Sequence, residues 1–312
     1  MATRASSLAR WQASWVADQL GGAELVVVST EGDRRRDLPV GSLGGRGVFV
    51  REVQQAVLDG RADLAVHSAK DLPALDADGL VVTAVPFRAD PRDALVGVPF
   101  DELEPGATVA TGSPRRRAQL AWRRPDLTFR ELRGNIETRL AKVPPGGAVV
   151  VAMAALERLG LGDRATDVLG TEVVLPQGGQ GALAIECRSD DTAVRLRVAA
   201  VDHEPSRLCV AAERAFLAAL GGGCDAPAGA LAVRDGKGGM KMEVVLARGD
   251  GGVLARRSAE TSLERTDPAA LQQPFARAQA LGRSLAAELL DHCGGEWIMG
   301  SLARQSVAAP HP

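Results

Sequence analysis

The chain has 312 residues, 46% of them hydrophobic, which is enough for two or three domains with separate buried cores. Its 37 basic and 39 acidic residues nearly cancel, so net charge does not favour binding to nucleic acid or to an anionic membrane surface. No stretch approaches the roughly 18 uncharged apolar residues of a membrane span, and residues 1–10 lack a hydrophobic signal core, so we expect a cytoplasmic protein.

Short apolar runs alternate with amphipathic stretches along the chain. The apolar runs predict strands at residues 24–28, 64–66, 107–110, 148–151 and 182–185. The amphipathic stretches predict helices at residues 6–20, 48–59, 114–123, 137–143, 153–159 and 206–220. This alternation indicates an α/β fold.

Two segments rich in proline and glycine, at residues 86–91 and 175–181, interrupt the pattern, and we expect hinges there. A further domain is expected after Gly223, with a strand at 242–246, a turn at 249–252 and one or two helices within 268–290. Residues 34–47 have the glycines and charges of a mobile loop, although an ordinary surface connection fits their composition equally well.

The segment 66–73 follows a predicted strand and lies at its carboxyl end, where α/β folds place ligands. Lys70 and Asp71 are adjacent in it. The Asp71 carboxylate can accept a hydrogen bond from an NH group and stabilise a developing positive charge. Alternatively it caps the turn, and on this segment alone the turn is the commoner interpretation.

The segment 108–117 has the pattern of a strand, a polar turn and a helix. Ser113 suits the position before the helix, and Pro114 suits its first turn. Free NH groups at such a helix start, with the hydroxyls of Thr111 and Ser113 and with arginine side chains, bind carboxylate or phosphate. The three arginines 115–117 cannot all face one ligand, so at least one is expected in solvent.

A similar unit follows at residues 131–140. Arg133 ends a predicted strand, Gly134 permits a tight turn, and Arg139 lies on the next helix. Two strand-turn-helix units that each carry arginines beside the turn or on the following helix suggest a ligand with several negative charges. Neither matches GxxxxGK[ST] or GxGxxG, so a nucleotide is not indicated.

The four cysteines form no CxxC pair, which fits neither a disulfide framework nor a zinc cluster. Cys224 follows three glycines, which let the backbone approach a ligand and present the thiol as a nucleophile when deprotonated. A free cysteine is more often a small buried apolar residue, and Cys187, Cys209 and Cys293 fit that interpretation better.

In this order the four clusters resemble the porphobilinogen deaminases, also called hydroxymethylbilane synthases. The resemblance runs from Thr3 to about Gly229 and continues weakly to the C-terminus. Its matching segments are residues 3–6, 44–49, 59–63, 70–71, 111–120, 132–140, 158–161, 179–182, 212–214 and 222–224. Any one of them is weak, but together and in register they are specific.

The resemblance implies a transferase of tetrapyrrole biosynthesis. It would remove ammonia from four porphobilinogen molecules, join them head to tail on a covalent dipyrromethane primer, and release hydroxymethylbilane by hydrolysis. Cys224 would carry the primer through a thioether, and Asp71 would be catalytic, its carboxylate stabilising the electron-poor pyrrole left when ammonia departs. No metal is implied, and we expect a monomer.

The growing chain accumulates acetate and propionate groups, which need arginine side chains in a cleft. By resemblance, the residues that bind the cofactor besides Cys224 are Lys70, Asp71, Thr111, Ser113, Arg115, Arg116 and Arg133. Those that bind substrate are Arg4, Ser6, Phe49, Arg139, Arg164 and Gln180.

The family fold implies two α/β domains like those of periplasmic binding proteins, at residues 1–88 with 181–200 and at 89–180, and a smaller α/β domain at 201–312 that carries the cysteine loop. The family usually has an apolar strand before Thr3, whereas only Met1 and Ala2 precede it here. Either the start is misplaced or the first domain lacks a central strand. The main alternative function is a two-lobed binding protein, since fold does not determine function. Reversible binding requires neither Cys224 nor Asp71.

Overall fold

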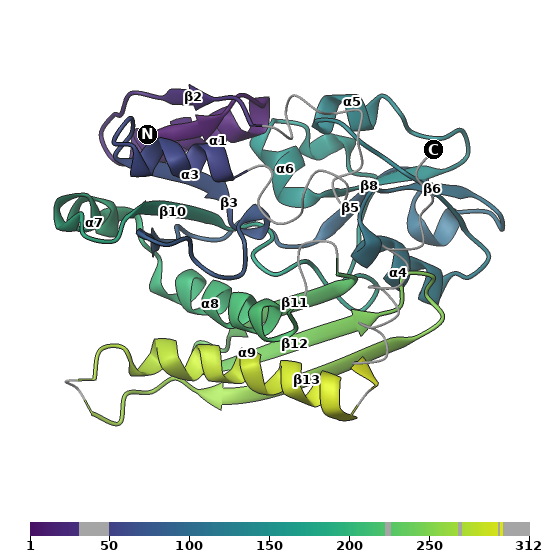
Figure 1. Cartoon of the computed structure of the whole chain (residues 1–312). Helices are drawn as coiled ribbons and strands as arrows, with labels where there is room; N and C mark the ends of the chain where they lie inside the picture. Colours follow the sequence, from purple (N-terminus) through teal and green to yellow (C-terminus); the bar gives the residue numbers. More distant parts are fainter. Residues whose placement is uncertain (31–49, 222–225, 268–269, 293, 296–312) are drawn as a thin grey trace, which may run out of the picture.

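The computed structural model describes residues 1–30, 50–221, 226–267, 270–292 and 294–295. These residues form two five-stranded mixed sheets and a three-stranded antiparallel sheet, with helices packed on each (Figure 1). The predicted α/β class, with two sheets followed by a smaller C-terminal part, is confirmed. Within the described residues, no helix combines the length and the apolar character needed to cross a membrane.

The first sheet has the strand order β2-β1-β3-β10-β4. Its strands are β1 Ala2–Arg4, β2 Val26–Val28, β3 Leu64–Ser68, β4 Leu80–Ala84 and β10 Leu183–Arg188. Helix α1, Ser7–Gln19, packs on one face, and helix α3, Arg51–Leu58, packs on the other. Helix α7, Thr192–Val198, and the 3-10 turn η5, Ala199–Val201, follow β10.

Strand β1 lies between β2 and β3 and is parallel to both. Of the two alternatives drawn from the short segment before Thr3, a first domain without a central strand is therefore wrong. Met1 and Ala2 are buried in the cores on the two faces of the sheet, and the amine of Met1 donates to Glu24 O at 2.9 Å.

The second sheet has the order β7-β6-β8-β5-β9. Its strands are β5 Asp93–Gly97, β6 Thr108–Ala110, β7 Thr128–Arg130, β8 Ala148–Ala152 and β9 Asp167–Val168. Its helices are α4 Pro114–Arg123, α5 Ile136–Leu140 and α6 Met153–Arg158, with 3-10 turns η3 Phe100–Glu102 and η4 Gly162–Arg164. The prediction that Arg133 ends a strand is wrong, because β7 stops at Arg130. Arg133 lies in the turn before α5.

The two proline- and glycine-rich segments are the connections between these sheets. The chain passes from β4 to β5 through the first and returns to β10 through the second. They run side by side, since Ala89 N donates to Gly181 O at 3.1 Å. Gly181 has φ 83°, and a Cβ there would lie 2.5 Å from Ala89 O, so only glycine permits this approach. Movement at these hinges and the three domain boundaries stay predictions.

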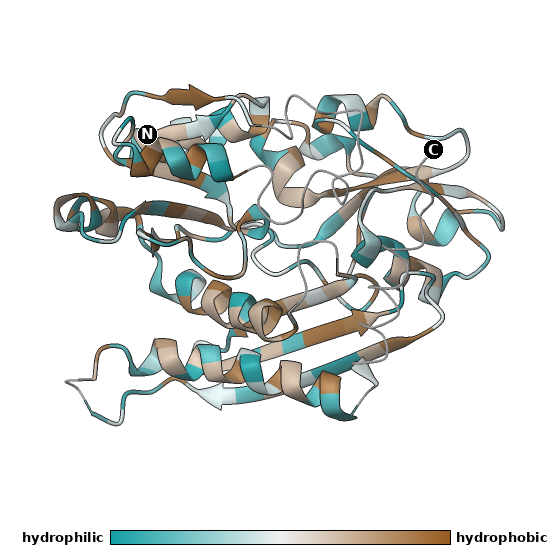
Figure 2. Cartoon of the chain, in the orientation of Figure 1, coloured by the Kyte–Doolittle hydropathy of each residue, from teal (hydrophilic) through white to brown (hydrophobic). Residues whose placement is uncertain are grey.

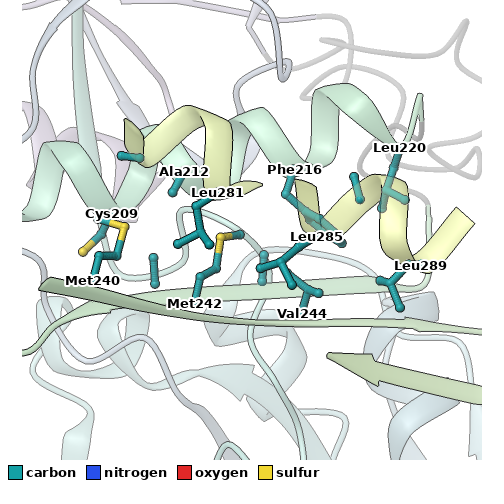
Figure 3. Close-up of a cluster of buried hydrophobic side chains, with 14 of the residues drawn as sticks. Cys209, Ala212, Phe216, Leu220, Met240, Met242, Val244, Leu281, Leu285 and Leu289 are labelled. Carbon is teal, nitrogen blue, oxygen red and sulfur yellow. The ribbon is translucent and has the colours of Figure 1, made fainter. Parts of the chain in front are cut away.

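The C-terminal part consists of β11 Ala228–Arg234, β12 Gly239–Ala247 and β13 Leu254–Ser262, with α8 Glu204–Ala219 and α9 Gln273–His292 side by side on one face (Figure 1). Figure 3 shows Phe216, Leu281 and Leu285 of the helices packed onto Met242 and Val244 of β12. Figure 2 shows hydrophilic and hydrophobic residues alternating along both helices, as in amphipathic helices.

Glu213 of α8 ties this part to the connections. Its buried carboxylate accepts from Arg88 at 2.6 and 3.2 Å, from Gly179 N at 2.6 Å and from Ala232 N at 2.8 Å. A buried carboxylate is tolerated only when it is paired and hydrogen-bonded in this way. The C-terminal part is thereby fixed to both connecting segments.

Candidate functional site

The predicted catalytic residue, Asp71, ends a 3-10 turn, η2 Ala69–Asp71, directly after β3. The turn is held by Ala69 N, which donates to Ala182 O at 3.0 Å, and by Leu72 N, which donates to Ala69 O at 3.3 Å. Asp71 is half-buried, and its carboxylate makes no hydrogen bond or ion pair with any described residue. A carboxylate held in this way is available to a ligand.

Asp71 lines a cavity together with Arg4 and Ser6, which were predicted to bind substrate. Arg4 ends β1, and Ser6 caps α1 by accepting from Ala9 N at 3.3 Å. Sequence reasoning missed Gln12, which is 2% exposed, lines the same cavity and donates to Ser68 Oγ at 2.9 Å. The available signal was a glutamine on the apolar face of an amphipathic helix.

The side chain of Lys70 reaches Gln180, which lies in the second connecting segment between the two sheets. Its Nζ donates to Gln180 Oε1 at 3.1 Å, and Gln180 Nε2 donates to Asp93 Oδ1 and Pro91 O, both at 2.8 Å. Burial and the nearby Arg116 lower the pKa of Lys70 to about 8, although Asp71 and Asp93 oppose the shift. Gln180 therefore bridges a cation of the first sheet and a carboxylate of the second.

Asp93, which sequence reasoning also missed, is the centre of a buried ion cluster. Arg115 Nη2 lies 2.8 Å from Asp93 Oδ2, and Arg116 Nη2 lies 2.7 Å from Asp93 Oδ1. Burial raises the pKa of Asp93, but the two arginines and the bond from Gln180 lower it further, to well below its usual range. The first residue of a short strand gives no sequence signal for this role.

Arg115 and Arg116 are 3% and 5% exposed, and the Nη1 group of each donates to a carbonyl. Arg115 Nη1 bonds Leu175 O at 2.7 Å, and Arg116 Nη1 bonds Val150 O at 3.0 Å. In this structure they hold the second sheet and the connection together. Direct binding of cofactor by these two arginines stays a prediction. Arg117, the third of the run, is exposed, as expected for at least one of them.

Thr111 and Ser113 build the start of α4. Thr111 Oγ1 accepts from Ser113 N at 3.2 Å, and Ser113 Oγ accepts from Arg116 N at 3.4 Å, which confirms Ser113 as the cap. At Gly112 a Cβ would lie 2.6 Å from Leu132 O, so glycine lets the turn before α5 approach this helix start. The turns of the two strand-turn-helix units therefore lie against each other.

Arg133 and Arg139 come from the second unit. Arg139 Nε donates to Gly134 O at 2.8 Å, and Arg133 pairs with Glu131 at 2.7 Å. Burial and the proximity of Arg116 lower the pKa of Arg139 to about 10, with a further contribution from Arg133 and an opposing one from Asp71. Arg116 and Asp71 are thus within electrostatic reach of both Lys70 and Arg139.

The structure does not bring all predicted residues together. Arg164 is exposed at the end of η4 and makes no hydrogen bond or ion pair with the other predicted residues that the structure describes. Phe49 and Cys224 lie outside the described residues. Cys187 and Cys209 are buried, as expected for packing residues, and burial raises the pKa of Cys209 to about 12. Neither is suited to be a nucleophile.

Two family models match the chain. "Porphobilinogen deaminase, dipyromethane cofactor binding domain" matches residues 1–196, and "Porphobilinogen deaminase, C-terminal domain" matches residues 207–291. A porphobilinogen deaminase of Thermobifida fusca is 45% identical over 315 residues, covering 97% of this chain and 96% of the relative. One of Nitratidesulfovibrio vulgaris is 42% identical over 307 residues, covering 95% and 94%.

Among solved structures, a TRAP periplasmic solute binding protein of Ralstonia eutropha H16 with bound (S)-2-acetolactate aligns over 97% of this chain and 99% of its own. The sequence identity is 12% and the TM-score is 0.38. A likeness at this level carries no argument about what the site binds.

Proposed function

The chain belongs to the porphobilinogen deaminase family, and from this premise we propose that the Asp71 cavity deaminates four porphobilinogen molecules and couples them head to tail, with hydroxymethylbilane as the product. The observation that carries the proposal is the carboxylate of Asp71, which has no hydrogen bond or ion pair to any described residue and lies within electrostatic reach of Lys70 and Arg139. Such a cluster fits a substrate that brings carboxylates and develops positive charge on its ring.

The residues present also fit the dipyrromethane cofactor. Burial and the nearby Arg116 lower the pKa values of Lys70 and Arg139, and carboxylates of a bound ligand would favour their charged forms. We propose that the cofactor is attached to Cys224 and held by Lys70, Asp71, Thr111, Ser113, Arg115, Arg116 and Arg133, and that Arg139 contacts the substrate. When bound, this group supplies the pyrrole carbon to which the first substrate unit is joined.

Asp71 performs two tasks in this proposal. When ammonia leaves porphobilinogen, the pyrrole NH becomes more acidic and more positive, and the carboxylate stabilises it through a charge-assisted hydrogen bond. After coupling, the same carboxylate accepts the proton that leaves the ring carbon. Arg4 and Ser6, which line the same cavity, bind the carboxylates of the incoming substrate. Arg164, Phe49 and Gln180 remain proposed substrate contacts.

The test is the intact mass of the denatured protein together with product formation. We expect an excess of two porphobilinogen units less two ammonias, and linear hydroxymethylbilane on incubation with porphobilinogen. Cys224→Ser removes the attachment site, and we expect its mass to stay unmodified. A two-lobed binding protein would instead bind porphobilinogen reversibly, with unmodified mass and no product.

Lys70 offers a second test, because its pKa of about 8 makes its amine a nucleophile at lower pH than an ordinary lysine of pKa about 10.4. In the primer-free Cys224→Ser variant, acetylation of Lys70 is expected to reach half its maximal rate near pH 8. In the primer-loaded protein it should be slower, since ligand carboxylates stabilise the ammonium. Peptide mass spectrometry measures both rates, with exposed Lys142 as the internal control. Equal pH dependence at Lys70 and Lys142 would contradict the assignment.

We further propose that the protein acts as a monomer in the cytoplasm, without nucleic acid or membrane. The near balance of acidic and basic residues supports this. Sedimentation at working concentration tests the oligomeric state.

A further inference from the structure

A buried polar cluster beneath the Lys70–Asp71 turn has no part in the function proposed above. It joins His67 of β3, Glu186 of β10 and Gln54 of α3, which are 6%, 1% and 7% exposed. Gln54 Nε2 lies 3.0 and 3.1 Å from the two Glu186 carboxylate oxygens, and His67 Nε2 lies 3.3 Å from Glu186 Oε2. Hydrogen bonds join Glu186 of β10 to Gln54 of α3, and the ring of His67, on the strand that enters the turn, lies against the same carboxylate.

The strand register explains why these side chains meet. His67 pairs with Ala184 and Glu186 pairs with Ala65, so His67 and Glu186 are diagonal neighbours on one face of the sheet. Ala65 packs in the core formed with α3, which identifies this as the face that α3 covers. Ser68, the next residue of β3, points to the opposite face, where it bonds α1.

This cluster weakens the core in which it lies. The contact between His67 and Glu186 falls short of hydrogen-bond geometry, so the buried Nε2 of His67 has no hydrogen-bond partner in the part of the chain that the structure describes. A buried polar atom without a partner and a buried carboxylate both cost free energy that apolar side chains of similar volume would not. Departures of this kind are expected where a side chain serves function.

The position of Asp71 depends on its backbone, because its carboxylate has no partner among the described residues. The backbone of the turn is held from one side by Ala182 O and by Gln177, whose Nε2 donates to Lys70 O at 3.1 Å. His67 is the last but one residue of β3, so anchoring its side chain fixes the direction in which the chain enters the turn. His67 also lines the cavity that contains Asp71.

We propose that His67 and Glu186, supported by Gln54, are positioning residues that hold the Lys70–Asp71 turn in the geometry that turnover requires. Among the described residues, Glu186 of β10 is the charged group in contact with the His67 ring, and the charged residues Arg4 and Asp71 line the same cavity as His67. This inference rests on the proposed function, which gives Asp71 its catalytic role. The anchoring of the turn can be measured independently of enzymatic activity.

The test replaces the imidazole by a ring of similar size without nitrogen, His67→Phe, in the full chain. Amide exchange at residues 69–72 is expected to be at least about fivefold faster. kcat should fall at least about tenfold with KM within about threefold, because the turn binds substrate but holds Asp71 less well. His67→Gln, which keeps an NH donor near Glu186, should recover most of both losses. His203→Phe removes an imidazole from the distant start of α8 and should leave residues 69–72 and kcat unchanged.

Unchanged exchange at residues 69–72, or a kcat within about twofold of the wild type, would overturn the proposal. If His67→Phe does not fold, Glu186→Gln makes the same comparison, since it removes the charge and keeps the volume. Failure of the proposed function is distinguishable, because wild-type protein would then form no product while the exchange measurement would still report whether His67 anchors the turn.

Discussion

Replacing Asp71 by asparagine is expected to lower kcat by about 10²- to 10⁴-fold and to change KM little. Asparagine has nearly the same shape and still accepts a hydrogen bond from a pyrrole NH, so substrate binding is retained. It carries no negative charge and takes up no proton at neutral pH, so it neither stabilises the positive ring nor accepts the proton after coupling. No described residue makes a hydrogen bond or ion pair with the Asp71 carboxylate, and the substitution therefore breaks no such contact.

Steady-state kinetics with purified protein measure this effect, and intact mass shows whether the primer is still attached. Asp78→Asn is the matched control, since Asp78 is an exposed aspartate seven residues further along the chain. It should leave kcat within about twofold of the wild type. An Asp71→Asn variant with kcat close to that of Asp78→Asn would remove Asp71 from the chemistry.

Replacing Asp93 by asparagine is expected to lower the free energy of unfolding by about 3–5 kcal/mol, because it leaves Arg115 and Arg116 buried without their shared carboxylate. Denaturant unfolding at pH 7 measures the change. Asp90→Asn is the control, because the Asp90–Arg92 pair is solvent-accessible, with the Arg92 side chain 46% exposed. Loss of that pair should cost less than about 1 kcal/mol. Equal losses in the two variants would show that the buried cluster contributes nothing special.

The pH dependence of the Asp93 effect has a defined sign. The pKa of Asp93 in the folded protein lies well below its usual range, because Arg115 and Arg116 outweigh the opposing effect of burial. Its stabilisation is therefore complete above the unfolded pKa of about 3.9 and is lost as the pH falls toward the folded value. The difference between wild type and Asp93→Asn should shrink by about 1.4 kcal/mol per pH unit below pH 4. A difference that stays constant from pH 7 to pH 3 would contradict this account.

Local sequence patterns predicted most of the helices and several of the strands, but they missed β4, β5 and β11. Helix α4 begins at Pro114 and ends at Arg123, as its cap, proline and amphipathic spacing indicate. The breaks at residues 86–91 and 175–181 fall between the two sheets, because proline and glycine interrupt the hydrogen bonding of both helices and strands. Strand β13 was also missed, because Leu254 is its only large apolar residue and the rest of the strand consists of charged and small polar or alanine residues.

The sequence by itself determined the order of the elements, the α/β class and which kinds of side chain lie at the ends of the strands. It could do so because helix caps, turns and hydrophobic periodicity depend on residues only a few positions apart. It also showed the resemblance to the family, through Asp71, the arginine-containing segments 111–120 and 132–140, and Cys224. Only the tertiary structure decided which charges meet. Asp93 binds arginines more than 20 residues away in the chain, and Glu186 reaches Gln54 across 132 residues. Such pairs depend on the order of the strands in each sheet and on their register. Strand order and register leave no local sequence pattern that distinguishes a buried carboxylate from an exposed one.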